Sequence, residues 1–197
     1  MQALKDKIRA EGRYMGDGIL KIDSILNHQM EPQLVRAMGD EIARRFRDAQ
    51  PTRVLTAEVS GIAPALMTAL ALGVPMVYAR KHKPITMYGP IFLETASSPT
   101  HGGEVNLMVA AEYLPPNERV LIVDDFLASG KTLYSLARMV GAAKCTLVGI
   151  AVVVEKAFAG GREKLEKYNV PVAALVTLTY LSEDQIVFAD DDFQPES

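Results

Sequence analysis

Short runs of β-branched and other apolar residues alternate along this chain with longer stretches of helical periodicity. The apolar runs predict buried strands over residues 53–57, 76–79, 119–123 and 146–154. The periodic stretches predict helices around residues 34–46, 62–72 and 133–140. Continuous apolar strands that alternate with helices are typical of a mostly parallel sheet covered on both faces. The pattern therefore predicts an α/β fold.

Two segments do not follow this alternation. Residues 1–30 precede the first predicted strand. Residues 81–103 contain Pro84, Pro90 and Pro99 and show little periodicity. A connection of this length inside a compact domain is usually functional or disordered, and a mobile hairpin is the plainer alternative.

Composition narrows the class of protein. The 197 residues suit a single domain over 1–197, and the net charge of −3 gives no general attraction to nucleic acid or to anionic membranes. Apolar runs stay well short of the roughly 20 residues that span a bilayer, and the charged N-terminal stretch does not resemble a signal peptide. We therefore expect a cytoplasmic protein. Cys145, the one cysteine, excludes an intramolecular disulfide and is expected to be a buried, inert thiol.

The stretch VLIVDDFLASGKT, residues 120–132, carries the candidate chemistry. Asp124 and Asp125 follow the predicted strand at the carboxyl edge, where ligands bind in open parallel sheets. A loop of small and polar residues, 128–132, then leads into a helix, whose free N–H groups and dipole favour a phosphate. A triphosphate-binding loop would require glycine where Asp125 stands. A sugar phosphate fits better, because its hydroxyls can donate to the carboxylates while its phosphate binds the loop. Either aspartate alone would be read as a turn or cap residue.

The same stretch resembles the binding signature for 5-phosphoribosyl-1-pyrophosphate (PRPP) of the type I phosphoribosyltransferases, although Lys131 replaces the small residue often found there. Further stretches, among them ILKIDSILNHQMEP, SGIAPALMTALALGVPMVYARKHK and VVVEKAFAGGREKL, are similar to a group within that family, the bacterial xanthine phosphoribosyltransferases. The resemblance implies the type I fold, a mostly parallel twisted sheet flanked by helices, with a small hood over the base site built from about residues 1–30 and the C-terminal strands. It implies transfer of the 5-phosphoribosyl group from PRPP to N9 of xanthine, which gives XMP and pyrophosphate in purine salvage. It also implies Mg²⁺ bound with PRPP, no metal held by protein ligands alone, and a homodimer, for which Met38 and Met67 are candidate interface residues.

The resemblance assigns roles for PRPP to four parts of the chain. Asp124 and Asp125 would bind the ribose hydroxyls and the magnesium complex of PRPP. The phosphate would bind the loop formed by Ala128, Ser129, Gly130, Lys131 and Thr132. Pyrophosphate would contact Ser60, Gly61, Arg80 and Lys81, where glycine permits a strained backbone near a ligand. Residues 81–103 would close over the site and exclude water.

The base would contact Leu20, Asn27 and Lys156. A lysine suits an oxo group and opposes an exocyclic amine, which favours an oxopurine over adenine. Phe158 would either stack on the base or pack in the core. His82 and His101 are interpreted as loop residues and not as metal ligands.

Two alternatives remain open at this point. The chain could be an adenine or hypoxanthine-guanine phosphoribosyltransferase, since EKAFAGGREKL also resembles the adenine enzymes. It could instead be a regulator that senses PRPP without catalysis, although no basic helix-turn-helix extension is visible and the net charge is negative.

Overall fold

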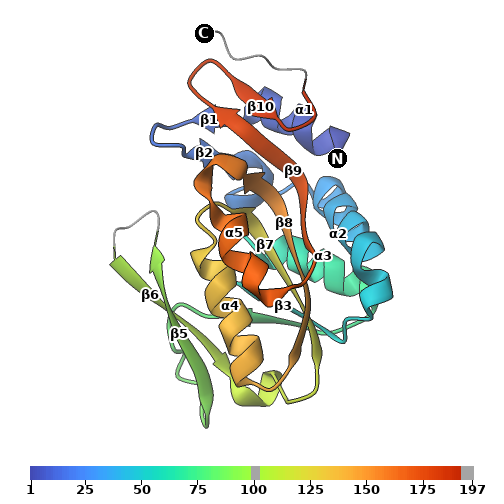
Figure 1. The fold of residues 1–197 in the computed structure, drawn as a ribbon, viewed down its shortest axis with the longest axis vertical. Coiled ribbons are helices and arrows are strands. Elements are labelled where there is room, and N and C mark those ends of the chain that lie inside the picture. Colours follow the sequence, from blue (N-terminus) through green and yellow to red (C-terminus); the bar gives the residue numbers. More distant parts are fainter. Residues whose placement is uncertain (99–102, 192–197) are drawn as a thin grey trace.

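A twisted sheet of six strands forms the centre of the molecule (Figure 1). The computed structural model describes residues 1–98 and 103–191. The strands run in the order β10-β9-β8-β7-β3-β4, and their bounds are β3 (Arg53–Ala57), β4 (Met76–Ala79), β7 (Arg119–Leu127), β8 (Thr146–Lys156), β9 (Val172–Leu181) and β10 (Ile186–Phe188). All neighbours pair in parallel except β10, which is antiparallel to β9. The predicted parallel α/β fold is confirmed.

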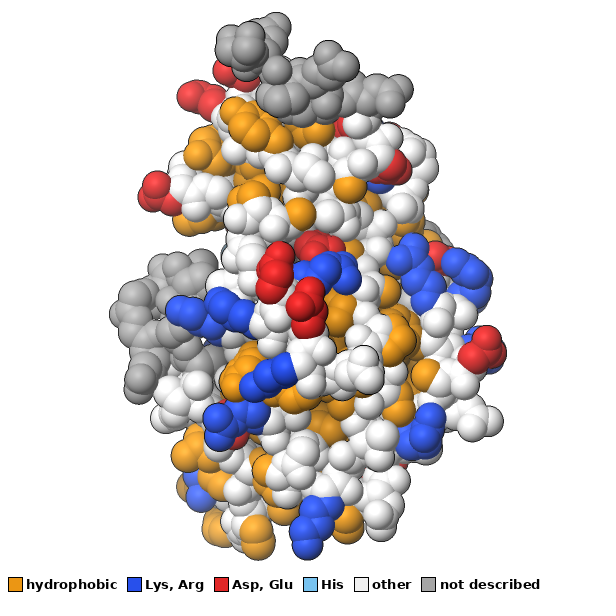
Figure 2. Space-filling view, in the orientation of Figure 1, with side chains coloured by type: hydrophobic (Ala, Val, Ile, Leu, Met, Phe, Trp, Pro, Cys, Tyr) orange, Lys and Arg blue, Asp and Glu red, His pale blue; other side chains and the backbone are white. Residues whose placement is uncertain are grey.

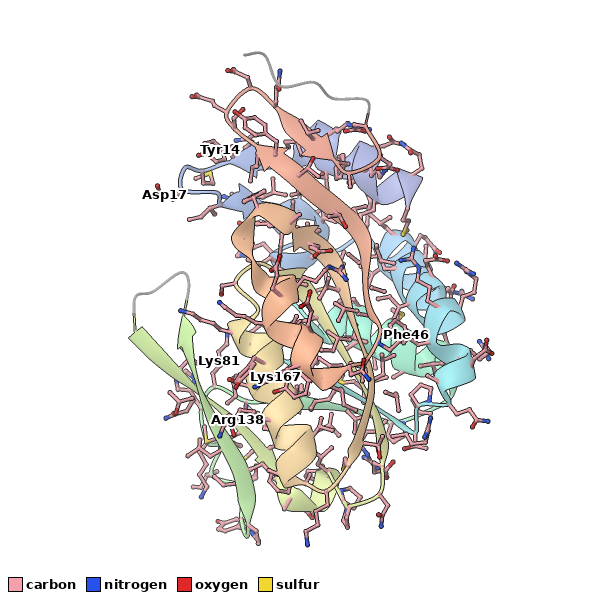
Figure 3. All side chains as sticks on the ribbon, viewed as in Figure 1. Tyr14, Asp17, Phe46, Lys81, Arg138 and Lys167 are labelled. Atoms are coloured by element: carbon pink, nitrogen blue, oxygen red, sulfur yellow. The ribbon has the colours of Figure 1, made fainter. Side chains whose placement is uncertain are left out.

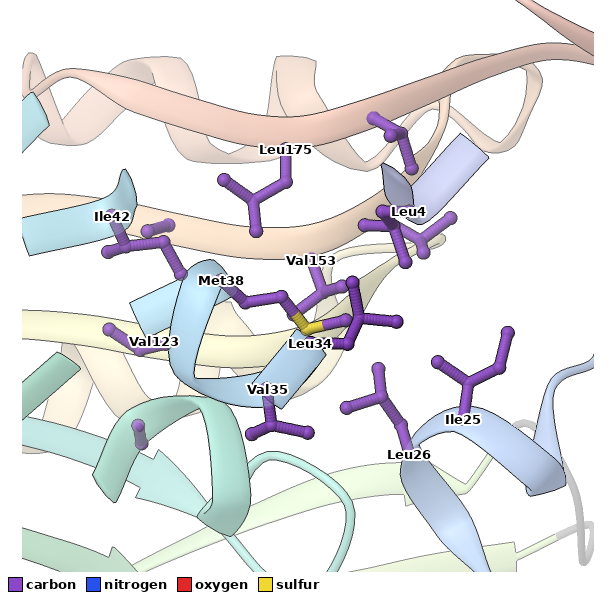
Figure 4. Packing of buried hydrophobic residues seen from close by; sticks show 14 of the residues in the cluster. Leu4, Ile25, Leu26, Leu34, Val35, Met38, Ile42, Val123, Val153 and Leu175 are labelled. Carbon is purple, nitrogen blue, oxygen red and sulfur yellow. The ribbon is translucent and has the colours of Figure 1, made fainter. Parts of the chain in front are cut away.

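Helices cover both faces of the sheet, as the continuous apolar strands require. One face carries α2 (Pro32–Phe46) and α3 (Ile62–Leu72), and the other carries α4 (Lys131–Ala142) and the short α5 (Gly161–Leu165) (Figure 1). The two faces form separate apolar clusters, and Figure 4 shows Met38 of α2 packed among side chains of the first one. Charged side chains of both signs lie over the opposite, α4 and α5 side (Figure 2).

Strand β7 is longer than the sequence pattern predicted. It continues through Leu127, so Asp124 and Asp125 lie within the strand and do not follow it. The reason is the parallel ladder to β8, which still pairs Asp124 with Val152 and Leu127 with Glu155. Backbone pairing of this kind is indifferent to side-chain polarity, and the apolar pattern could not reveal it. Strand β8 likewise extends to include Lys156.

The N-terminal segment packs against the C-terminal strands. It forms α1 (Gln2–Glu11), the paired strands β1 (Arg13–Tyr14) and β2 (Leu20–Lys21), and one π-helical turn, η1 (Asp23–Asn27). The terminal amine donates to the Leu175 carbonyl at 3.0 Å, and α1 forms ion pairs with the residues after β10, from Lys5 to Asp190 and from Arg9 to Asp191. These contacts bring the N-terminal segment and the residues directly after β10 together at the end of the sheet where the predicted hood would lie.

The segment predicted as a mobile loop, residues 81–103, includes strand β5 (Ile91–Ser98). This strand forms a two-stranded antiparallel ribbon with β6 (Gly103–Ala110), most of which lies beyond the predicted loop. Arg80 and Met108 exchange both backbone hydrogen bonds, at 2.8 and 2.9 Å, and so join the ribbon to the end of β4. Pro99 and His101 lie outside the described residues.

Four single turns of 3-10 helix complete the described structure: η2 (Arg47–Ala49), η3 (Ala111–Tyr113), η4 (Ala157–Ala159) and η5 (Glu166–Tyr168). In the parts of the chain that the structure describes, no helix is both long enough and apolar enough to cross a bilayer.

Candidate active site

Two adjacent carboxylates lie near the carboxyl end of β7. Asp124 is 5% exposed and Asp125 is partly buried. Asp124 Oδ1 accepts from the Asp125 N–H at 3.1 Å, and Asp125 Oδ1 accepts from the Phe126 N–H at 2.9 Å. Burial, followed by the charge of Asp125, raises the pKa of the Asp124 carboxyl well above its usual range, and burial also raises the pKa of Asp125. The pair is therefore poised to bind a cation or hydroxyl donors, either of which favours the ionised form.

The segment after these carboxylates forms the start of α4. Gly130 is the N-cap residue and has a φ of +73°, a conformation that disfavours side chains. Because glycine has no side chain to cap the helix, the N–H groups of the first turn remain available to a ligand. Lys131 and Thr132 are the first two helical residues. The predicted position of this loop at a helix N-terminus is confirmed.

A pocket of about 300 Å³ joins the carboxylates to this loop. Residues predicted for PRPP and for the base line it together, namely Leu20, Asp124, Asp125, Ala128, Ser129, Gly130, Lys131, Thr132 and Lys156. Ile19, Phe126 and Leu133 also line it and were not predicted. Phe126 could have been inferred from the signature itself, because it directly follows the two aspartates.

Lys156, the last residue of β8, reaches across to the hairpin between β1 and β2. Its ammonium donates to the Gly18 carbonyl at 2.7 Å and lies 5.2 Å from the centroid of the Phe126 ring. Burial lowers the pKa of this lysine. Phe158 is 48% exposed beside Gly18, and it is not among the residues that line the pocket.

Asn27 and Ser60 lie outside the pocket lining and contact each other. The Ser60 hydroxyl donates to Asn27 Oδ1 at 2.9 Å, while Asn27 Nδ2 donates to Asp23 Oδ1 at 3.1 Å. The amide group of Asn27 is thus oriented from both ends. The contact joins the N-terminal segment to the turn after β3.

Gly61 has an ordinary φ of −69°, so the strained backbone expected at this glycine is not found. The need for glycine is one of space. A Cβ at Gly61 would overlap Asp124 Oδ1 and Thr56 Oγ1. The turn after β3 is therefore packed directly against the carboxylates of β7.

Arg80 and Lys81 follow β4 and are held by Glu58, which the sequence pattern did not identify. Glu58 Oε1 accepts from the Lys81 N–H at 2.6 Å, and Glu58 Oε2 lies 4.0 Å from Arg80 Nε. The charge of Lys81 opposes the rise in the pKa of Asp124, which places its ammonium in the field of the carboxylate pair. Figure 3 shows Lys81 on the same side of the molecule as the two-stranded ribbon of β5 and β6.

Among the described residues, no three His, Cys, Asp or Glu side chains cluster as metal ligands. Asp124 and Asp125 supply carboxylate oxygens of the kind that Mg²⁺ prefers, next to a pocket with room for a phosphorylated ligand. The residues present therefore fit an ion that is brought in by such a ligand.

Comparisons with known proteins agree with this geometry. Residues 21–184 match the family of the phosphoribosyl transferase domain. The chain is 51% identical to a xanthine phosphoribosyltransferase of Deinococcus deserti, over 93% of this chain and 95% of that one, and 46% identical to one of Moorella thermoacetica, over 95% and 96%. An adenine phosphoribosyl transferase structure from Trypanosoma brucei shares the fold, with a TM-score of 0.74 at 22% identity over 98% of this chain and 86% of that one. The chain therefore belongs to the phosphoribosyltransferase family, alongside the bacterial xanthine phosphoribosyltransferases.

Proposed function

We propose that this protein transfers the 5-phosphoribosyl group of PRPP to N9 of xanthine, giving XMP and pyrophosphate. One observation carries the proposal: a single pocket contains the buried carboxylate pair, the helix N-terminus and Lys156. Each feature matches a different part of the two substrates, and the relatives named xanthine phosphoribosyltransferase span nearly the whole chain.

Asp124 and Asp125 accept hydrogen bonds from the ribose hydroxyls of PRPP. The 5′-phosphate binds the N–H groups at the start of α4, where Ser129 and Thr132 add hydroxyl donors and Lys131 adds a positive charge. The arrangement holds the ribose by its hydroxyls and by its 5′-phosphate, and so fixes the position of its anomeric carbon.

Pyrophosphate binds on the other side of the carboxylates, at Ser60, Gly61, Arg80 and Lys81. Two contacts support this assignment: Gly61 packs against Asp124, and the Lys81 N–H donates to Glu58 in the turn after β3. Both bring these residues close to the carboxylate pair. Asp124 and Asp125 would hold Mg²⁺ that is bound with PRPP, and the ion would offset the charge of the PRPP phosphates.

Xanthine binds between Leu20 and Lys156, with its oxo group toward the ammonium and Asn27 at the edge of the site. The Asn27 amide, oriented by Ser60 and Asp23, keeps both a donor and an acceptor for a ring N–H and a carbonyl. An exocyclic amine would meet the ammonium of Lys156 as a second donor, so the site disfavours adenine.

In the reaction, the lone pair of N9 forms the bond to the anomeric carbon as the bond from that carbon to pyrophosphate oxygen breaks. The electron pair of the broken bond leaves with pyrophosphate, and the N9 proton is released. Positive charge develops on the ribose, so donors around the leaving group and exclusion of water lower the barrier. We assign the exclusion of water to closure of the segment 81–103.

We also propose that the enzyme is a cytoplasmic homodimer. Met38, a candidate interface residue from the sequence, is fully buried in the core and is excluded from that role, and Met67 is only partly buried. Leu66 and Leu70 of α3 are 47% and 70% exposed, which makes that helix a better candidate surface. Light scattering after size-exclusion chromatography tests the assembly.

The decisive experiment measures pyrophosphate release from PRPP and Mg²⁺ with xanthine, guanine, hypoxanthine or adenine. The proposal expects xanthine to give the highest kcat/KM. A preference for adenine or hypoxanthine would support the alternative enzymes, and PRPP binding without pyrophosphate release for any purine would support a regulator. Replacing Asp124 and Asp125 together by alanine should abolish turnover, whereas Asp40→Ala on the exposed face of α2 should leave it unchanged.

A further inference from the structure

The short helix α5 packs against the phosphate loop from outside the pocket. A Cβ at Gly161 would overlap the Ala128 carbonyl, and a Cβ at Gly130 would lie 2.7 Å from the Gly161 carbonyl oxygen. Two glycine backbones therefore meet at this contact, and any side chain on either would push the segments apart. Neither Gly161 nor any other residue of α5 lines the pocket.

Lys164, on the same helix, holds the loop directly. Its ammonium donates to the Ser129 carbonyl at 2.9 Å, and the residue is otherwise exposed. The carbonyls of Ala128 and Ser129 thus both face α5. Because the C=O and N–H of a trans peptide point in opposite directions, the N–H groups of Ser129 and Gly130 are aimed away from α5.

The helix itself is anchored to the sheet. Arg162 donates to both carboxylate oxygens of Glu155 at 2.7 and 2.5 Å and to the Val172 carbonyl at 2.8 Å. Glu155 is 3% exposed and also accepts from the Thr177 hydroxyl at 3.3 Å, while Leu165 is fully buried. Strands β8 and β9 therefore fix the position of α5, and α5 can transmit that position to the loop.

We propose that Lys164 is a positioning residue for phosphoribosyl transfer, which holds the Ser129 carbonyl on the α5 side so that the loop presents its N–H groups to the 5′-phosphate. The inference rests on the proposed function, since it takes the loop to be the 5′-phosphate site. Its effect is confined to ligands that carry this phosphate. Lys164 does not touch the substrate in this role.

The test compares Lys164→Met with Lys167→Met. Lys167, labelled in Figure 3, lies three residues further on in η5. It contacts the ring and hydroxyl of Tyr134 instead of the loop. Calorimetric titration with ribose 5-phosphate and with inorganic pyrophosphate separates the two halves of PRPP. We expect Lys164→Met to weaken ribose 5-phosphate binding about fivefold, the usual effect of one such hydrogen bond. Pyrophosphate binding should be unchanged. The KM for PRPP should rise, while kcat should stay within about twofold of the wild-type value.

Two further variants separate positioning from a simple effect of charge. Lys164→Arg keeps the donor and should restore most of the binding. Gly161→Ala changes no charge and should weaken ribose 5-phosphate binding at least as much as Lys164→Met, because it displaces the Ala128 carbonyl. Lys164→Met decides alone if Gly161→Ala does not fold, since Lys164 is exposed.

Unchanged ribose 5-phosphate binding in Lys164→Met overturns the inference and leaves the proposed function intact, and so does a folded Gly161→Ala that binds like the wild type. An equal loss in Lys167→Met also overturns it. A wild-type protein that binds no ribose 5-phosphate and forms no nucleotide from PRPP overturns both proposals together.

Discussion

Replacing Asp124 by asparagine should stabilise the ligand-free protein while it removes activity. Asp124 is 5% exposed, and its carboxylate accepts a hydrogen bond from the Asp125 N–H at 3.1 Å. Asparagine has nearly the same shape, and its Oδ1 can keep that bond. The change removes the buried charge and its repulsion with Asp125, the two causes that raise the pKa of this carboxyl.

A buried and poorly compensated charged group costs about 1–3 kcal/mol or more, and we take about 2 kcal/mol for Asp124. In a chain of this length, each kcal/mol shifts the melting temperature by about 2–4 °C, so the variant should melt about 4–8 °C higher near neutral pH. The sign follows from linkage. An unfolded aspartate titrates at about pH 3.9, and the pKa of Asp124 in the folded protein lies above that value. Between the two values the folded state binds more protons, so wild-type stability falls as the pH rises through that window.

Differential scanning calorimetry without Mg²⁺ or phosphate, in buffers from about pH 4 to about pH 8, tests this reasoning. The gain of Asp124→Asn over the wild type should be small at the acid end and should grow with pH. Asp40→Asn, whose side chain is 60% exposed, serves as the control and should shift the melting temperature by less than about 2 °C. A variant that melts at or below the wild type near neutral pH, or a gain that does not depend on pH, would refute the reasoning.

Three further predictions concern the base site, the core and the lone thiol. Lys156→Met should lower kcat/KM for xanthine about 10- to 100-fold, the value of a charge-assisted hydrogen bond, and should leave PRPP binding unchanged. An equal fall in kcat/KM for both substrates in steady-state kinetics would contradict the assignment. Gly39→Ala should lower the free energy of unfolding by about 1–3 kcal/mol in urea titrations, because the new methyl group would overlap Met67 of α3. A higher free energy of unfolding, from the better helix propensity of alanine, would show that α3 can move aside. Cys145 should react slowly with iodoacetamide in the folded protein, because burial raises the pKa of its thiol, and quickly in urea; equal rates would show that the thiol is accessible.

The layered fold could be read from the sequence because buried parallel strands are apolar on both faces. Strands β3 and β4 and helix α3 have the predicted bounds, 53–57, 76–79 and 62–72. The end of β7 was missed because its backbone pairing with β8 continues through the two aspartates, which the apolar pattern had placed after the strand. The ribbon β5–β6 was not resolved into strands, because Pro84, Pro90 and Pro99 lie close around β5 and made the whole segment read as a loop.

The parts of the site that lie close together in the sequence could also be predicted, namely the carboxylate pair and the loop before α4. The contacts that hold them could not. Lys156 bonds to Gly18 across 138 positions, and Lys164 bonds to Ser129 across 35. No local pattern encodes such pairs, because they arise only when the strands are in register. Glu155 and Arg162, seven positions apart, read alone as an ordinary surface pair, and the burial of Glu155 appears only in the fold.

If Lys156 binds the purine as proposed, its hydrogen bond to the Gly18 carbonyl makes base binding an exchange reaction. A purine that accepts a hydrogen bond from the ammonium must displace the Gly18 carbonyl or share the ammonium with it. The measured affinity is then the difference between the bond to the purine and the bond to Gly18. Substitutions in the hairpin turn that weaken the internal acceptor would then tighten purine binding without any new contact to the purine. The hairpin is therefore a place where evolution or engineering can retune affinity while the pocket itself stays the same.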